Sequence, residues 1–382
     1  MIESSEMRYR LKMLSVDLPI SFDDDDPISH ISDTGWRKIT KMFEAGQLND
    51  LRISGCGCKR STLEFLLQST AAKNLSSLDI SHNRLYANAY KEFQSSPAKF
   101  RSIRIAGNND ANTTLTPLLQ APCTESLLEL DISHSNSKEI KFAVIAKSKY
   151  WSQAERFCAS SCELDSEQFQ YLTQHNSPNL RHLDLGGNYL RTEGISYLCE
   201  APWADSLTYL SLWNNYLDDE SCEVLAKSGR FKQLRTLQLS GNNPSQRESS
   251  GEQITDSGII GLCISSALAN LRMLALGHNL IGDASVEAIF NAPFTLSALH
   301  LNRTNVTKQA ILTIARSPKL ARLNTLDLSG NHQLRKQDLR PLAESPYLSP
   351  LCELDLTGIT LSLELREAFH DRLGRRRFTY SG

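Results

Sequence analysis

The sequence lacks the long apolar runs and the charge excess that would point to several common functions. No stretch of the 382 residues approaches a membrane span, and the N-terminal segment MIESSEMRYRLKML has no apolar core of signal-peptide length. The formal net charge is −2, so nothing global favours nucleic acid or an acidic membrane surface. We therefore expect a cytoplasmic protein with neither nucleic acid nor membrane as a partner, while signal-less export into a host cell stays open.

Motifs of cofactor, metal and redox chemistry are also missing. The chain contains no Gly-rich phosphate loop, no H-E-x-x-H pair and no C-x-x-C pair, and Cys56 and Cys58 are spaced too tightly for a usual zinc pair. The nine cysteines are odd in number and scattered, which fits reduced thiols better than a disulfide framework. We expect no cofactor, no metal site and no enzymatic activity.

What the sequence does contain is a repeat. Residues 180–190 read L-x-x-L-x-L-x-x-N-x-L, and this pattern recurs along most of the chain. Successive copies lie 25 to 28 residues apart, apart from one gap of 37, which identifies a leucine-rich repeat array. Aligned on the second leucine of the pattern, the twelve anchor residues are Leu51, Leu78, Ile103, Leu130, Phe157, Leu183, Leu210, Leu237, Leu274, Leu299, Leu326 and Leu354.

Each unit predicts a strand followed by a buried amide. The L-x-L alternation points both leucines to one side of a short strand. An asparagine five residues after the anchor can satisfy backbone groups of the loop that leaves the strand. Cys56 and Cys162 take the same position, whereas Ser135, Thr304 and Ile359 depart from it. The asparagines are Asn83, Asn108, Asn188, Asn215, Asn242, Asn279 and Asn331.

The second half of each unit predicts a helix. Residues 221–226, 285–290 and 310–315 carry apolar side chains at spacings of three and four. Seven prolines stand at nearly the same position within the repeat unit, each directly after a serine or an alanine. We interpret them as helix terminators. These are Pro97, Pro122, Pro178, Pro202, Pro293, Pro318 and Pro346.

The motif and the repeat length resemble the ribonuclease-inhibitor-like subfamily of leucine-rich repeat proteins, over roughly residues 48–362. The resemblance implies an α/β solenoid with a parallel β-sheet on its concave face and α-helices on its convex face. Neighbouring strands lie about 4.8 Å apart while helices need about 8–10 Å. The stack is therefore expected to curve into a horseshoe with the strands inside.

The ends and the long gap define the expected organisation. Residues 1–47 are interpreted as an N-terminal capping or degenerate repeat, with a strand near Leu14 and a helix near Trp36. Residues 48–362 hold about twelve repeats, with a polar insertion at residues 243–252. Residues 363–382 are expected to form a capping helix and a basic tail.

The residues one position after the anchors predict a charge ladder in the first units. Arg52, Asp79, Arg104 and Asp131 alternate in sign, so adjacent strands should bring arginine beside aspartate. Such exposed pairs stabilise a fold by only about 0–1 kcal/mol each. We interpret the strand face of these first units as structural or as a surface that binds weakly and without specificity. A specific partner surface is the alternative interpretation.

Aromatic and basic residues predict a binding surface from the fifth to the tenth repeat. Trp213 stands in a column that elsewhere carries mostly small residues, and such a tryptophan favours a partner contact. Packing against the insertion at residues 243–252 is the alternative explanation. The candidate partner-binding residues are Arg156, His182, Tyr209, Trp213, Asn214, Tyr216, Met273, His278, His300 and Arg303.

Two possible chemical sites are unfavourable by distance. His82, His134 and His278 share a column but lie at least two strands apart, at least about 10 Å by strand spacing, which is too far for one metal ion. Cys158 and His182 should be about 7–8 Å apart as diagonal neighbours, too far for a nucleophile and its base.

The expected function is therefore non-enzymatic binding of a protein partner, by a monomer, through the concave face. One alternative is an adaptor or effector that recruits or regulates a ubiquitin ligase or a small GTPase, because Ran GTPase-activating proteins and some secreted bacterial proteins carry similar repeats. Arg191, Arg247 or Arg303 could then serve as a catalytic arginine, although no motif supports one. A structural element of a larger assembly is a further alternative.

Overall fold

The structure is a computed structural model that describes residues 13–15, 35, 48–108, 115–135, 142–242, 253–374 and 376–380. It divides into two compact units, residues 1–183 and 184–382. The insertion at residues 243–252 and the helix expected near Trp36 lie outside the described residues. No helix in the described ranges is long and apolar enough to cross a membrane.

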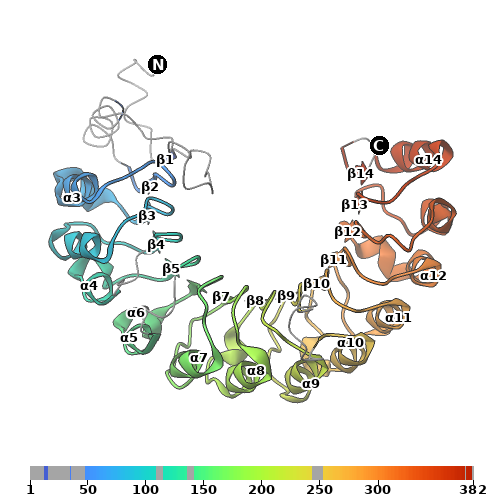
Figure 1. The fold of residues 1–382 in the computed structure, drawn as a ribbon, viewed down its shortest axis with the longest axis horizontal. Helices are drawn as coiled ribbons and strands as arrows, with labels where there is room; N and C mark the ends of the chain where they lie inside the picture. Colours follow the sequence, from blue (N-terminus) through green and yellow to red (C-terminus); the bar gives the residue numbers. More distant parts are fainter. Residues whose placement is uncertain are drawn as a thin grey trace. The chain divides into compact units, whose positions relative to one another are not determined.

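The first unit is a parallel sheet with helices on its outer side (Figure 1). Strands β1 to β6 pair in chain order and in parallel, with one anchor residue directly opposite the next. The strands are β1 Met13–Ser15, β2 Asp50–Arg52, β3 Ser77–Asp79, β4 Ser102–Arg104, β5 Glu129–Asp131 and β6 Arg156–Cys158. The helical elements are α3 Arg60–Gln68, η1 Thr70–Asn74, η2 Ala87–Ser95, α4 Thr116–Leu119, η3 Pro122–Thr124, α5 Phe142–Ala146, α6 Lys149–Gln153 and α7 Ser166–Thr173.

The second unit repeats this arrangement with longer helices (Figure 1). Strands β8 to β14 pair in chain order and in parallel, and β7 His182–Asp184 spans the division between the units. The strands are β8 Tyr209–Ser211, β9 Thr236–Gln238, β10 Met273–Ala275, β11 Ala298–His300, β12 Thr325–Asp327, β13 Glu353–Leu356 and β14 Phe378–Tyr380. The helical elements are α8 Arg191–Glu200, η4 Ala204–Ser206, α9 Asp219–Lys227, α10 Asp256–Cys263, η5 Ser266–Leu268, α11 Asp283–Asn291, α12 Lys308–Arg316, η6 Pro318–Arg322, η7 Lys336–Leu339, α13 Arg340–Ala343 and α14 Leu363–Leu373.

The predicted leucine-rich-repeat solenoid is confirmed at the level of its elements. All twelve anchor residues lie within strands β2 to β13, and the three predicted helical segments lie within α9, α11 and α12. Each of the seven prolines follows the end of a helical element, as expected of terminators. Within each unit the strands line the inner side of the curve and the helices the outer side (Figure 1).

Buried asparagines join each strand loop to the next repeat. The Asn83 amide group donates to the carbonyls of Ile53 and Ile80 at 2.8 and 2.9 Å. Its oxygen accepts from the backbone amides of Cys56 and Cys58 at 3.0 and 2.9 Å. One side chain thus satisfies backbone groups of two repeats, which explains why asparagine is the commonest residue at this position.

The C-terminal end contains an element that the sequence analysis did not anticipate. Helix α14 is present as expected, but the chain continues beyond the basic residues into β14, which pairs with β13. Phe378 of β14 is buried and its ring centroid lies 5.1 Å from that of Phe369 in α14. These contacts cover the apolar edge of the last repeat.

Candidate functional site

The ten predicted site residues fall on both units. Arg156 and His182 lie in the first unit, where Arg156 Nη1 is 3.4 Å from His182 Nδ1. The other eight lie in the second unit, on strands β8, β10 and β11 or in the loops that follow them. They gather there into two groups, one around Trp213 and one around His278.

Trp213 lies against the preceding repeat. A Cβ atom placed on Gly186 would fall 1.8 Å from Trp213 Nε1, so only glycine leaves room for the indole there. The Trp213 backbone oxygen accepts hydrogen bonds from Gly187 N and Asn215 Nδ2, at 2.6 and 3.1 Å. The indole is half-buried in this position. The contact that we describe is thus with Gly186, whereas the insertion considered as an alternative lies outside the described residues.

Two tyrosines extend the Trp213 group along the loop rim. The rings of Tyr189 and Tyr216 stack with centroids 5.4 Å apart, and the Arg191 guanidinium lies 5.9 Å from the Tyr216 ring. Tyr189 is 43% exposed, so an aromatic surface remains open to a partner. Tyr216 is among the ten candidate residues, whereas Tyr189 is not, and the contact of Arg191 with the Tyr216 ring was not expected from the sequence. Both tyrosines stand six residues after their anchors, a signal that could have revealed the stack.

The second group lies on β10 to β12 and their loops. His300 Nδ1 is 3.6 Å from Asp327 Oδ2 on the neighbouring strand. Burial alone would raise the pKa of Asp327, but hydrogen bonds from His300 and Ser329 leave this pKa below its ordinary value. Burial and the nearby Arg303 lower the pKa of His278. The group therefore combines the ionised Asp327 carboxylate and the Arg303 guanidinium with a His278 imidazole that is mostly neutral near neutral pH.

Asn214, His278 and Arg303 share an unusual backbone conformation. Each stands four residues after its anchor, with φ of 49°, 60° and 50°, in the left-handed region that favours glycine. Other repeats place glycine at this position, among them Gly187, Gly241 and Gly330. A side chain here costs of order 1 kcal/mol of backbone strain. His82, His134 and Ser161 adopt the same conformation at this position, so the left-handed backbone belongs to the repeat and does not by itself mark these three residues as functional.

The remaining candidates, Tyr209, Met273 and Arg303, lie beside these two groups. Tyr209 and Met273 are half-buried, and both lie directly opposite Thr236 of the intervening strand β9. Arg303 lies against Gly330, where an added Cβ would fall 2.5 Å from Arg303 Cγ. Three arginines were considered as a catalytic arginine. Arg191 lies over the Tyr216 ring, Arg303 lies against Gly330, and Arg247 is outside the described residues.

The predicted charge ladder has a second, local role. The register places Arg52 beside Asp79 and Arg104 beside Asp131 as expected, while Arg52 forms an ion pair with Asp50 of its own strand at 3.0 Å. The aspartates one position after the anchors bind their own loops, through one carboxylate oxygen and the amide two residues later, an arrangement that favours a turn. The five aspartates are Asp79, Asp131, Asp184, Asp327 and Asp355, at 2.8 to 3.1 Å.

One distance expected from strand spacing was wrong. The ring centroids of His82 and His134 are 6.2 Å apart, not at least about 10 Å. The reason is that His82 leans over the intervening glycine, since a Cβ on Gly107 would fall 2.2 Å from His82 Nδ1. Among the described residues no group of three or more His, Cys, Asp or Glu side chains could hold a metal ion.

The cysteines are free, and eight of the nine are buried. Burial raises the pKa of Cys58 and Cys123 to about 12 and that of Cys199 to about 11. A thiol with such a pKa carries almost no thiolate at neutral pH and is a poor nucleophile.

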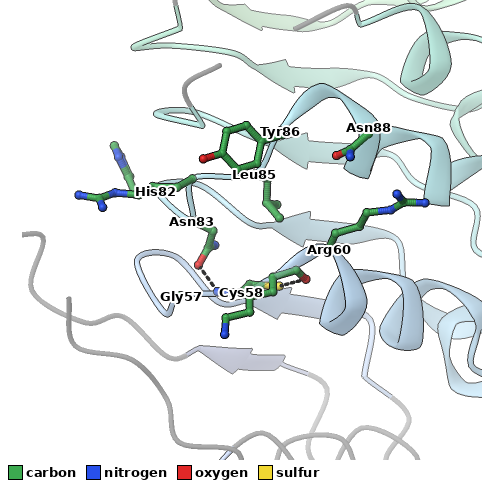
Figure 2. Close-up of a pocket in the computed structure, with 10 residues that line it drawn as sticks. Gly57, Cys58, Arg60, His82, Asn83, Leu85, Tyr86 and Asn88 are labelled. Carbon is green, nitrogen blue, oxygen red and sulfur yellow. Dashed lines mark hydrogen bonds between the residues drawn. The ribbon is translucent and has the colours of Figure 1, made fainter. Parts of the chain in front are cut away.

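A cavity of about 310 Å³ lies in the first unit, between the start of α3 and the loop that follows β3 (Figure 2). Its walls include Cys58, Leu85, Tyr86 and Arg60. Arg60, the first residue of α3, pairs with Glu92 of η2 at 2.7 Å. Lys59 and Arg84 also line the cavity and no acidic residue among those described does, so its charged lining is basic.

Comparison with known proteins places the chain among repeat proteins. A sequence model of the family described as Leucine Rich repeat matches residues 176–199, which include the pattern at residues 180–190. The chain is 30% identical over 163 residues to NACHT, LRR and PYD domains-containing protein 9C of Mus musculus, covering 40% of this chain and 15% of that protein. It is 31% identical over 137 residues to Toll-like receptor 9 of Bos taurus, covering 36% of this chain and 12% of the receptor.

The chain thus spans less than a sixth of the length of these two relatives. Among solved structures, a chain in the crystal structure of the Rad7 and Elc1 complex in yeast superposes with a TM-score of 0.57. The sequence identity is 17%, and the match covers 90% of this chain and 77% of that chain. At this identity the likeness concerns the fold.

Proposed function

Because the chain is a leucine-rich repeat protein, we propose that it binds a protein partner, without catalysis, through the strand face of its repeats. The observation that carries the proposal is the group formed by Trp213, Tyr189, Tyr216 and Arg191 in the second unit. Tryptophan, tyrosine and arginine dominate the energetics of protein interfaces. Here these side chains are held in place before any partner arrives, so little conformational entropy is lost on binding.

The His278 group supplies the polar part of the same surface. His300 and Asp327 form a pair on adjacent strands, and Arg303 extends from the next loop. The β9 repeat between the two groups carries Ser240 and Gly241 at the corresponding loop positions. A partner segment could rest on these small residues, with aromatic contacts on one side and basic and acidic contacts on the other.

We further propose that the protein acts as a monomer in the cytoplasm, without nucleic acid. Nine free cysteines, of which eight are buried, support a reducing compartment. The net charge of −2 supports the absence of a nucleic-acid partner.

The proposal is tested with Trp213→Ala. A partner recovered with the wild-type chain by affinity capture and identified by mass spectrometry should bind this variant about 30-fold more weakly in calorimetric titration, since an interface tryptophan contributes about 2 kcal/mol or more. Gly186→Ala gives a second test, because its methyl group would displace the indole while Trp213 itself is retained.

The matched control is Tyr171→Ala, which removes a 48% exposed aromatic ring from helix α7. Circular dichroism and thermal unfolding should show that all three variants remain folded. An unchanged affinity of Trp213→Ala for the captured partner would contradict the proposed surface.

A further inference from the structure

A groove on the helix side of the second unit has no role in the function proposed above. Helices α9 and α10 are neighbours (Figure 1), and residues of both line this groove, whose volume is about 910 Å³. The α9 wall carries Glu220, Glu223 and Lys227, and the α10 wall carries Ile260 and Ile264. Its two walls therefore differ in chemistry, one charged and one apolar.

The apolar wall is exposed to an unusual degree. Ile264 is 80% exposed and Ile260 is 41% exposed, one turn apart at the C-terminal end of α10. Single exposed apolar residues are common on protein surfaces, but two large ones that line one groove are typical of an interaction site.

Gly261 keeps the floor of this groove open. A Cβ added to Gly261 would meet no atom within 4 Å, so no packing in the described chain requires glycine at this position. Gly258, one turn earlier, is different, because its Cβ would fall 2.5 Å from Asp219 Oδ1. Glycine in a helix interior is less favourable than alanine. The cost at Gly261 is explained if a partner approaches the helix backbone there.

Hydrogen bonds join the two walls of the groove at the start of both helices. Asp219 at the start of α9 accepts hydrogen bonds from Thr255 N, Thr255 Oγ1 and Gly258 N, at 2.8, 2.6 and 3.0 Å. These bonds fix the first turn of α10 against α9. They also occupy the Asp219 carboxylate, so the charge that faces solvent on this wall comes from Glu220 and Glu223, partly offset by the pairing of Glu223 with Lys227.

We propose that this groove binds an amphipathic helix of a partner protein, with its apolar stripe on Ile260 and Ile264 and its lysine or arginine side chains beside Glu220 and Glu223. A groove between two helices suits a helix laid along it. Hydrogen bonds occupy Asp219, and Lys227 pairs with Glu223. The negative charge of the lining therefore comes chiefly from Glu220, which favours a basic flank. The same charges disfavour a second copy of this chain, since two acidic rims would then face each other.

The experiment uses the full chain and a phage-displayed library of helical peptides. The library fixes leucine at positions i, i+3, i+4 and i+7 and randomises the flanking positions. Selection should enrich lysine and arginine at the flanks. A fluorescein-labelled peptide with the selected sequence is then titrated with the protein by fluorescence anisotropy.

Ile264→Asp should weaken binding of this peptide at least tenfold. The double variant Glu220→Lys/Glu223→Lys should also weaken it, and should shift the selection toward glutamate flanks. The matched control is Leu363→Asp, which places the same charge on a residue 72% exposed at the start of α14. Trp213→Ala should leave peptide binding unchanged, which separates this site from the strand-face surface.

Three results would overturn the proposal. The first is a selection that yields no binder or shows no charge preference at the flanks. The second is a selected peptide that binds Ile264→Asp as tightly as the wild type. The third is a dimer in analytical ultracentrifugation that Ile264→Asp converts to a monomer, because the occupant would then be a second copy.

Discussion

The two units share one strand pattern and differ on their helix sides. In the second unit, helices α9, α10 and α11 each begin with an aspartate that binds the start of the next helix. Asp219 binds Thr255 and Gly258, Asp256 binds Gly282 and Ser285, and Asp283 binds Thr307 and Ala310. In the first unit, helix α3 begins after Lys59, which makes no side-chain capping bond.

Helix length follows this division only in part. Helices α9 to α12 have eight or nine residues, and α4, α5 and α6 have four or five, but α3 and α7 of the first unit have nine and eight, and α13 of the second unit has four. A carboxylate at a helix start satisfies free amide groups and favours the helix dipole. A regular helix therefore does not require a shared cap, since α3 has nine residues without one, but in α9 to α12 such caps tie the start of each helix to the next.

Removing one of these caps should produce the largest change in stability. Asp256→Ala eliminates charge-assisted bonds to the amides of Gly282 and Ser285 and to the Ser285 hydroxyl, and leaves a buried serine without this acceptor. We expect a loss of about 3 kcal/mol in the free energy of unfolding, since bonds to a charged group contribute about 1.5–3 kcal/mol each and are not additive.

Urea unfolding measures the total loss, and hydrogen exchange at the Gly282 and Ser285 amides locates it. Asp256→Asn serves as the control, because it keeps one acceptor oxygen and should lose less. A loss below about 1 kcal/mol for Asp256→Ala would mean that the helix contacts alone hold α10 and α11 together.

Adding a cap to the first unit should have a smaller effect of opposite sign. The backbone of Lys59 is extended, with φ −91° and ψ 163°, as a capping residue requires. Lys59→Asp should therefore stabilise the protein by about 1 kcal/mol and slow hydrogen exchange at Ser61 and Thr62. Lys59→Ala removes the lysine without adding a cap, and equal stabilisation by this control would assign the gain to charge instead of capping.

Much of the fold could be predicted because its signals are local in the sequence. The repeat spacing locates every strand from β2 to β13, the asparagine five residues after the anchor marks seven of these twelve, and proline follows the ends of several helices. Strand β14 could not be predicted in this way, since Phe378–Tyr380 carries no repeat pattern. The shared aspartate caps were also missed, because they join residues 24 to 39 positions apart with no constant spacing.

The candidate surface was predicted only in part, for a geometric reason. The register places Tyr209 and Met273 correctly, because register fixes the backbone. It does not fix where long side chains lean, and here they lean over glycines of neighbouring repeats. Trp213 lies against Gly186 and His82 against Gly107, so rings meet at distances that strand spacing alone does not suggest.

The smallest expected effect compares two histidines whose pKa is lowered, His82 in the first unit and His278 in the second. Burial lowers the pKa of His82 first, the nearby His134 lowers it further, and Asp79 and Asp131 oppose the shift. For a lowered pKa the unfolded chain takes up the proton first, so His82 should reduce stability as the pH falls below about 6.5. His82→Gln should lessen that loss in urea unfolding at acidic pH and change little at neutral pH.

NMR titration of the imidazole Hε1 signals distinguishes the two causes of the lowered His82 pKa, burial and the nearby His134. His134→Gln should raise the pKa of His82 only in part, because burial remains. Arg303→Gln should do the same for His278 in the second unit, where burial acts first, Arg303 second, and Asp327 opposes both. If His134→Gln leaves the titration of His82 unchanged, the two rings do not influence each other's protonation. Packing over Gly107 would then account for the lowered pKa by itself.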